Sequence, residues 1–164
     1  MILADTNILG TFARVEGLDL LFDLFSHDEI GVASAVYAEL LAGVREGRQF
    51  LQTTVDLIES DRLKLLALTA EEVVRRLKLP STLDNGEAES ITLCQTRGAA
   101  FLTNDRRARN FCAAEGIEVF DLIDILRALW KLRVCSKRKV SQLMTDIETK
   151  EGMVIRQKDR VLAK

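Results

Sequence analysis

The first nine residues, MILADTNIL, decide the fold because they combine a short apolar strand with an abrupt polar stop. Residues 2–4 form a continuously apolar run, which is typical of a buried strand. Asp5, Thr6 and Asn7 end this run, and the apolar pattern that resumes predicts a helix over residues 8–15. The strand therefore presents a carboxylate and two further polar side chains where it gives way to a helix.

The same alternation of short apolar strands and helices continues along the chain. Further strands are expected at residues 30–33, 63–68, 99–103 and 117–120. Helices are expected at residues 18–25, 34–44, 48–59, 69–79, 87–96, 107–115 and 121–133. Ser34 is expected to be an N-cap, and Thr69 with Glu72 a capping box. Strands that alternate with helices predict an α/β fold, a three-layer α/β/α sandwich around a mainly parallel sheet of short strands.

Composition is typical of one ordinary globular domain. The chain has 164 residues, 48% of them hydrophobic and 29% charged, so it can form a hydrophobic core without disulfides or structural metals. The cysteines Cys94, Cys112 and Cys135 have neither disulfide nor zinc spacing. We see no leader peptide and no membrane span, and we therefore expect a cytoplasmic protein with no membrane partner. The net charge of −2 gives no general signal for nucleic-acid binding.

The C-terminal part of the chain differs in composition from the rest. It opens with the basic run Lys137, Arg138 and Lys139, and apolar residues become sparser. We therefore divide the chain into a main domain, residues 1–133, and a C-terminal helical appendage with a polar tail, residues 134–164. The helix of this appendage is expected near residues 140–149.

Acidic residues gather where the predicted strands end. In an open parallel sheet, ligands bind beyond the carboxyl ends of the strands. Asp5 follows the first strand, Asp105 follows a later apolar strand, and Glu39 lies in the helix after the second strand. Glu87 and Glu89 open the helix that precedes Asp105. Converging carboxylates repel one another, and a magnesium ion would remove that cost while activating water for in-line attack on phosphorus.

Four motifs, in order along the chain, make the sequence resemble the PIN domain family. They are Ala4-Asp5-Thr6-Asn7-Ile8-Leu9, Val36-Tyr37-Ala38-Glu39-Leu40, Gly86-Glu87-Ala88-Glu89 and Leu102-Thr103-Asn104-Asp105. The resemblance spans roughly residues 1–130 and implies an α/β/α nuclease that uses Mg²⁺ or Mn²⁺ at three or four acids. Many such proteins are the VapC-type toxins of toxin–antitoxin pairs. The resemblance therefore implies an RNA substrate, an antitoxin protein as partner, and a homodimer.

The resemblance also assigns roles to individual residues. The catalytic acids it implies are Asp5, Glu39, Glu87 and Asp105. The metal ligands among them are Asp5, Glu87 and Asp105, and the supporting polar residues are Thr6, Asn7 and Thr103. Glu87 stands eighteen residues before Asp105, where many PIN sequences have Asp, so Glu89 and Asp84 stay open for this third position. Asp121, after the last strand, is a further acid for the same rim.

Several of these residues also have a purely structural interpretation. Asp5, Asp105 and Asp121 suit helix N-caps, and Asp84 with Glu87 suits a capping box. The arginines that follow Asp105 are Arg106, Arg107 and Arg109. They suit either contacts with substrate phosphates or a solvated basic helix face.

The hypothesis that follows is a metal-dependent endoribonuclease, with a PIN fold that binds RNA or protein without cutting as the alternative. An acid at all four family positions favours the enzyme. A haloacid-dehalogenase-type phosphatase would need a second Asp where Asn7 stands. A receiver domain would need an acidic pair near the first strand and a late lysine, and neither is in place. A dinucleotide or nucleoside-triphosphate site is disfavoured because no glycine-rich phosphate loop is present.

Overall fold

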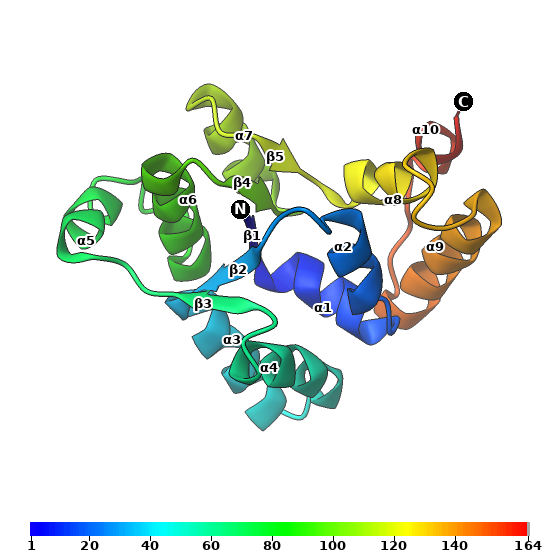
Figure 1. Ribbon diagram of the computed structural model, residues 1–164, viewed down its shortest axis with the longest axis horizontal. Coiled ribbons are helices and arrows are strands. Elements are labelled where there is room, and N and C mark those ends of the chain that lie inside the picture. The colour runs from blue at the N-terminus through cyan, green and yellow to red at the C-terminus, as the bar shows by residue number, and fades with distance from the viewer. Residues whose placement is uncertain (164) are drawn as a thin grey trace.

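A parallel sheet forms the centre of the computed structural model, which describes residues 1–163 (Figure 1). Within this range the sheet has five strands in the order β3-β2-β1-β4-β5, and every neighbouring pair is parallel. The strands are β1 (Ile2–Ala4), β2 (Ile30–Ala33), β3 (Lys64–Leu66), β4 (Ala100–Leu102) and β5 (Val119–Phe120). This sheet, with helices packed around it, confirms the predicted α/β sandwich.

Helices connect the strands as crossovers and cover the sheet. In chain order they are α1 (Thr6–Arg14), α2 (Leu18–Leu24), α3 (Ser34–Arg45), the short 3-10 helix η1 (Gln49–Leu51), α4 (Gln52–Glu59), α5 (Ala70–Arg76), α6 (Asn85–Arg97), α7 (Arg106–Ala114), α8 (Leu122–Lys131), α9 (Lys137–Glu151) and α10 (Lys158–Leu162). Figure 1 shows α5 and α6 on one side of the sheet and α1 and α2 on the other. The single helix expected at residues 48–59 is divided into η1 and α4.

The register of the central strands aligns the polar residues that follow them. β1 lies between β2 and β4, and all three of its residues are buried. Ala4 is the register partner of Leu102. Because the strands are parallel, the next residues along each, Asp5 and Thr103, leave the sheet at the same edge and the same level. The sequence indicates that each residue follows a strand, and the pairing of β1 with β4 makes the two residues neighbours.

The start of α3 differs from the sequence prediction. Ser34 was expected to cap this helix, but it is the first helical residue, and Ala33 occupies the N-cap position without a side-chain hydrogen bond. The Ala35 amide instead donates to Glu89 Oε2 at 2.9 Å. An unpaired amide at a helix start needs an acceptor, and here a distant helix supplies it. By contrast, the expected Thr69–Glu72 capping box is present at α5.

The C-terminal segment contributes to the same hydrophobic core as the rest of the chain. The buried residues of α9 are Val140, Leu143, Met144 and Ile147. The expected polar tail contains α10, whose Val161 is fully buried and accepts a 2.7 Å hydrogen bond from Trp130 Nε1. Figure 1 shows α9 and α10 beside α1 and α8. Within residues 1–163, no helix combines the length and the apolar character needed to cross a bilayer.

Candidate active site

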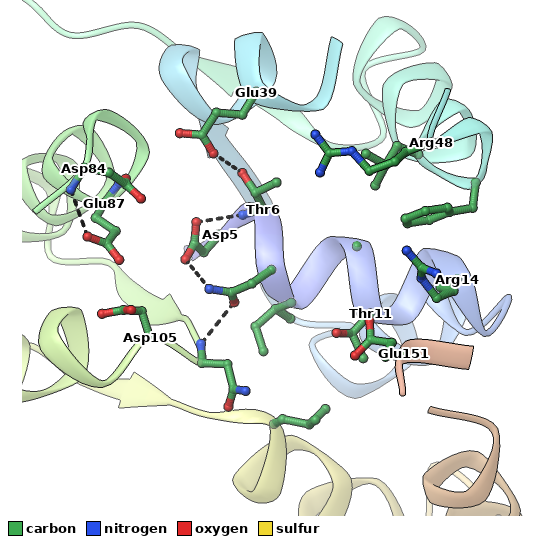
Figure 2. Close-up of a pocket in the computed structure, with 17 residues that line it drawn as sticks. Asp5, Thr6, Thr11, Arg14, Glu39, Arg48, Asp84, Glu87, Asp105 and Glu151 are labelled. Carbon is green, nitrogen blue, oxygen red and sulfur yellow. Dashed lines mark hydrogen bonds between the residues drawn. The ribbon is translucent and has the colours of Figure 1, made fainter. Parts of the chain in front are cut away.

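Five carboxylates gather at one end of a cavity at the carboxyl edge of the sheet. The cavity has a volume of about 460 Å³. Its acidic end is lined by Asp5, Glu39, Asp84, Glu87 and Asp105, which come from four separate stretches around β1, α3, α6 and β4. Figure 2 shows these side chains facing a common space. Within residues 1–163, none of the five is in an ion pair with a lysine or arginine, so their negative charges are not neutralised by the protein.

Asp5 is held by three donors at the start of α1. It is the N-cap of this helix, and its Oδ1 accepts from the Thr6 amide at 2.7 Å. Its Oδ2 accepts from Asn7 Nδ2 and from Thr103 Oγ1, both at 2.8 Å. The side chain is only 5% exposed, and burial raises its pKa to about 6 despite these hydrogen bonds. The capping and functional interpretations of Asp5 therefore describe the same geometry.

Glu39 is tied to the residue that follows Asp5. Thr6 Oγ1 donates to Glu39 Oε2 at 2.5 Å. Burial raises the pKa of Glu39, the hydrogen bond from Thr6 lowers it, and the charges of Asp84 and Glu89 raise it further. The start of α6 passes close by, and a Cβ built on Gly86 would lie 2.7 Å from Glu39 Oε1. Glu39 thus sits in a tight space that only glycine leaves open.

Asp84 and Glu87 form the capping box of α6 and also line the cavity. The Glu87 amide donates to Asp84 Oδ1 at 2.8 Å, and the Asp84 amide donates to Glu87 Oε2 at 3.0 Å. Each carboxylate keeps a second oxygen that accepts no hydrogen bond from residues 1–163. Burial raises the pKa of Glu87 to about 7, and the charges of Asp84, Asp105 and Asp5 add to this. The structural interpretation of this pair is correct, and it leaves both side chains available at the site.

Asp105 caps α7 with one oxygen and turns the other toward the cavity. Its Oδ1 accepts from the amides of Arg107 and Ala108, at 2.7 and 2.9 Å. Its own amide donates to Thr103 Oγ1 at 3.2 Å, and the same hydroxyl donates to Asp5. Thr103 therefore connects the acids that follow β1 and β4. Asn7 makes a second connection across this edge, because its Oδ1 accepts from the Asn104 amide at 3.1 Å.

Other sequence candidates lie outside the acidic cluster. Glu89 caps α3, as described above, and does not line the cavity. Asp121 forms a capping box with Asp124 at α8 and an ion pair with Arg109. The remaining basic candidates, Arg106 and Arg107, are exposed and are not among the residues that line this cavity. Of the three residues left open for the third acid, Glu87 and Asp84 line the cavity and Glu89 does not.

The sequence analysis missed the basic end of the cavity. Arg14, Arg48 and Glu151 line it across from the acidic end (Figure 2), and Phe50 lies against Arg14. No motif marks these residues. Arg14 ends α1, Arg48 and Phe50 lie around η1, and Glu151 ends α9. Only the packing of η1 and α9 beside α1 brings them to the site.

The acidic end has the donor chemistry of a divalent-cation site without a closed set of ligands. Within the described chain, no group of three or more His, Cys, Asp or Glu side chains is placed so that it could hold a metal ion. Mg²⁺ keeps several of its waters and takes only one or two carboxylates directly. Buried carboxylates with raised pKa and unused oxygens suit such an ion, because a cation would relieve both burial and mutual repulsion.

Fold and cavity together define an α/β/α protein with an acidic site at the carboxyl edge of a parallel sheet. The family model described as PIN domain matches residues 1–163, so the chain belongs to the PIN domain family. The match extends through α9 and α10, beyond the motifs recognised in the sequence. No curated protein matches the chain.

A solved structure supports the same fold. A chain of VapBC2 from Rickettsia felis, in a crystal structure described as bound to a DNA fragment from their promoter, is similar with a TM-score of 0.54. The two chains are 20% identical, and the similarity covers 74% of this chain and 98% of that one. At this identity the likeness establishes the shared fold.

Proposed function

We propose that this chain is a metal-dependent endoribonuclease that hydrolyses phosphodiester bonds of RNA. The observation that carries the proposal is the cluster of five carboxylates without a basic partner at the carboxyl edge of the sheet, in which Asp5 and Glu87 are buried. A protein that leaves such charges unpaired loses stability unless a cation binds there. Membership of the PIN domain family supports a nuclease in particular.

Some residues of the acidic end would hold the cation, and others would keep the acidic side chains in place. Asp5, Glu87 and Asp105 would hold Mg²⁺ or Mn²⁺, directly or through its waters, and Asp84 adjoins them. When bound, the ion supplies an activated water and stabilises the charge that develops on the phosphate oxygens. Glu39, at the other side of Asp5, would orient the attacking water or the ion's hydration shell.

The polar residues beside the acids act as positioning groups. Thr103 and Asn7 both donate to Asp5 Oδ2, which fixes the carboxylate rotamer before any ligand arrives. Thr6 does the same for Glu39. Preorganised ligands cost less to assemble when the cation and the substrate bind.

We further propose a toxin role, in which an antitoxin protein partners the chain. The support is the likeness to a chain of the VapBC2 structure together with the family match. A homodimer and a cytoplasmic location belong to the same proposal. Co-purification with the product of a neighbouring gene, and the mass of the purified protein in solution, test the partner and the dimer separately.

Cleavage of a labelled RNA pool tests the nuclease. Wild-type protein, freed of any bound partner, is incubated with Mg²⁺, Mn²⁺ or EDTA. Asp5→Asn keeps the size of the side chain and removes its charge, and Asp23→Asn on the exposed face of α2 is the matched control. We expect cutting with either metal by wild type and Asp23→Asn, and none with EDTA or by Asp5→Asn. Cutting by Asp5→Asn that equals wild type would overturn the assignment.

A non-catalytic PIN module that binds RNA or protein is the second candidate. One observation favours it: four of the five acids serve as caps or capping-box members, and no closed group of three metal ligands exists within residues 1–163. Folded protein that binds RNA but never cuts it, with either metal, would support this candidate over the enzyme.

A further inference from the structure

Arg14 marks a second, basic end of the cavity that holds the carboxylates. Asp5 caps the first turn of α1, and Arg14 is the last residue of the same helix. Both line the one cavity. Figure 2 shows Arg14 and Arg48 across the cavity from Asp84, Glu87 and Asp105. The cavity therefore has an acidic end and a basic end, joined by the length of α1.

The Arg14 guanidinium is held in place but keeps an unpaired charge. It lies over the Phe50 ring at 4.0 Å from the centroid, a cation–π contact. Its Nη1 donates to the Lys150 carbonyl at 3.2 Å, and Lys150 Nζ donates back to the Arg14 carbonyl at 3.2 Å. Its Nε is buried and has no hydrogen-bond partner within residues 1–163. In the same range, no carboxylate lies within ion-pair distance of Arg14.

We infer that Arg14 binds a backbone phosphate of the RNA strand, at a nucleotide beyond the bond that is cut. This inference rests on the proposed function. α1 has nine residues, so at about 1.5 Å per residue its two ends are roughly 13 Å apart. A phosphate near Asp5 cannot also reach Arg14, so Arg14 meets a different phosphate of the same strand. A fixed guanidinium with unused N–H groups suits such a phosphate, because it can donate two hydrogen bonds to it.

Two carboxylates, Glu46 and Glu151, lie near the arginines of this basic end. They allow the inference to predict the direction in which a substitution changes RNA binding. Arg48 already pairs with the exposed Glu46 at 2.8 Å, which leaves Arg14 as the stronger phosphate ligand. Glu151, from the end of α9, lines the cavity near Arg14 and repels an incoming phosphate. Loss of the charge at Arg14 should therefore weaken RNA binding, whereas loss of the charge at Glu151 should strengthen it. A merely structural role for both residues would weaken binding in both variants.

The experiment measures binding of a fluorescein-labelled single-stranded RNA of twelve nucleotides to protein carrying Asp5→Asn, with Mg²⁺ present, over a range of salt concentrations. Arg14→Gln and Glu151→Gln are added to this background. Arg62→Gln is the matched control, because Arg62 also lies over an aromatic ring, at 4.3 Å from the Phe22 centroid, and lies outside the cavity. The unmodified chain is assayed separately for cleavage.

We expect Arg14→Gln to weaken binding several-fold and to reduce the slope of log affinity against log salt by about 0.7, the value for one lost phosphate contact with a single strand. Glu151→Gln should tighten binding, and Arg62→Gln should leave it unchanged. Equal binding by Arg14→Gln and Arg62→Gln, or no RNA binding by the Asp5→Asn parent, would overturn the inference. Cleavage by the unmodified chain would stand in either case, so the two proposals fail separately.

Discussion

Thr6 Oγ1 donates a 2.5 Å hydrogen bond to Glu39 Oε2, although 33 positions separate the two residues in the chain. The Thr6 amide also donates to Asp5 Oδ1, so one residue positions two acids of the cavity. The contact joins the edge that follows β1 to the first turns of α3. It makes the placement of Glu39 depend on the same tight turn that fixes Asp5.

Thr6→Val should lower kcat/KM with little effect on stability. The hydrogen bond to Glu39 is lost, which costs roughly 1 kcal/mol or up to about tenfold in rate. The same hydrogen bond lowers the pKa of Glu39, so its loss should move the acidic limb of the pH–rate profile to higher pH. Thr6→Ser keeps the hydroxyl and should restore both. A Ser variant as impaired as the Val variant would show that shape, rather than the hydrogen bond, matters here.

Gly86→Ala should damage activity more than stability. The added Cβ would meet Glu39 Oε1 at 2.7 Å and Val36 Cγ2 at 3.2 Å. The end of the Glu39 side chain can move away, so the fold is kept but the Glu39 carboxylate is displaced. We therefore expect a loss of at least about tenfold in kcat/KM. Gly10→Ala is the comparator for stability, because its Cβ would meet only Leu51 Cδ2 at 3.7 Å. Thermal unfolding of both variants should stay near wild type.

The metal-free protein should lose stability as the pH rises. The pKa of Asp5 is raised from 3.8 to about 6, and that of Glu87 from 4.5 to about 7. The folded state therefore binds more protons than the unfolded state between these values, and stability falls with pH. The contribution is complete below about pH 4 and lost as the pH passes 6 to 7. Thermal unfolding in EDTA at pH 5 and pH 8 measures the loss.

Mg²⁺ should reverse this loss, because it binds the ionised carboxylates of the folded state. The rise in melting temperature on adding Mg²⁺ should be larger at pH 8 than at pH 5. Asp5→Asn, which removes one buried charge, should melt at a higher temperature than wild type at pH 8 in EDTA. Equal melting temperatures for wild-type protein at both pH values would contradict the raised pKa of Asp5 and Glu87.

Arg97→Gln should destabilise the protein without touching the site. Arg97 binds Glu72 through Nε at 2.9 Å and Nη2 at 2.8 Å, and the Glu72 side chain is 8% exposed. The hydrogen bond from Arg97 is the main one of several that lower the pKa of Glu72 to about 2, and removing it leaves a buried carboxylate with fewer donors. We expect a loss of roughly 2 kcal/mol in urea unfolding. Arg62→Gln, which breaks an exposed pair with Asp19, should change stability by less than about 0.5 kcal/mol.

A chain that ends at residue 133 should be strongly destabilised. Truncation removes four buried side chains of α9, which are Val140, Leu143, Met144 and Ile147. Burial of each contributes roughly 1.5–3 kcal/mol, which is large against a usual total of about 5–15 kcal/mol. Chemical unfolding of the shortened chain measures the effect. Unchanged, cooperative unfolding would instead support the division into a domain of residues 1–133 and an appendage.

Local pattern was sufficient for the elements and for the acids that follow them. Apolar runs ended by Asp5 and by Asp105 indicated buried parallel strands, because a strand covered on both faces has no polar positions until it ends. The capping box of Asp84 and Glu87 could also be predicted from the sequence, since its partners are three residues apart. The cap of α3 could not be predicted in this way. Glu89 supplies it from another helix, 54 positions away, and no short-range rule predicts such a partner.

The sequence by itself determined the fold class, the order of strands and helices, and the four acidic motifs, because each depends on residues close together in the chain. Tertiary structure decided which acids share the cavity and which residues face them. Glu87 and Asp84 point inward while Glu89 caps α3, a choice made by the packing of α6 beside α3. Arg14 became part of the site only because η1 and α9 pack against α1. Contacts between segments so far apart in the sequence are fixed by the burial of a shared hydrophobic core.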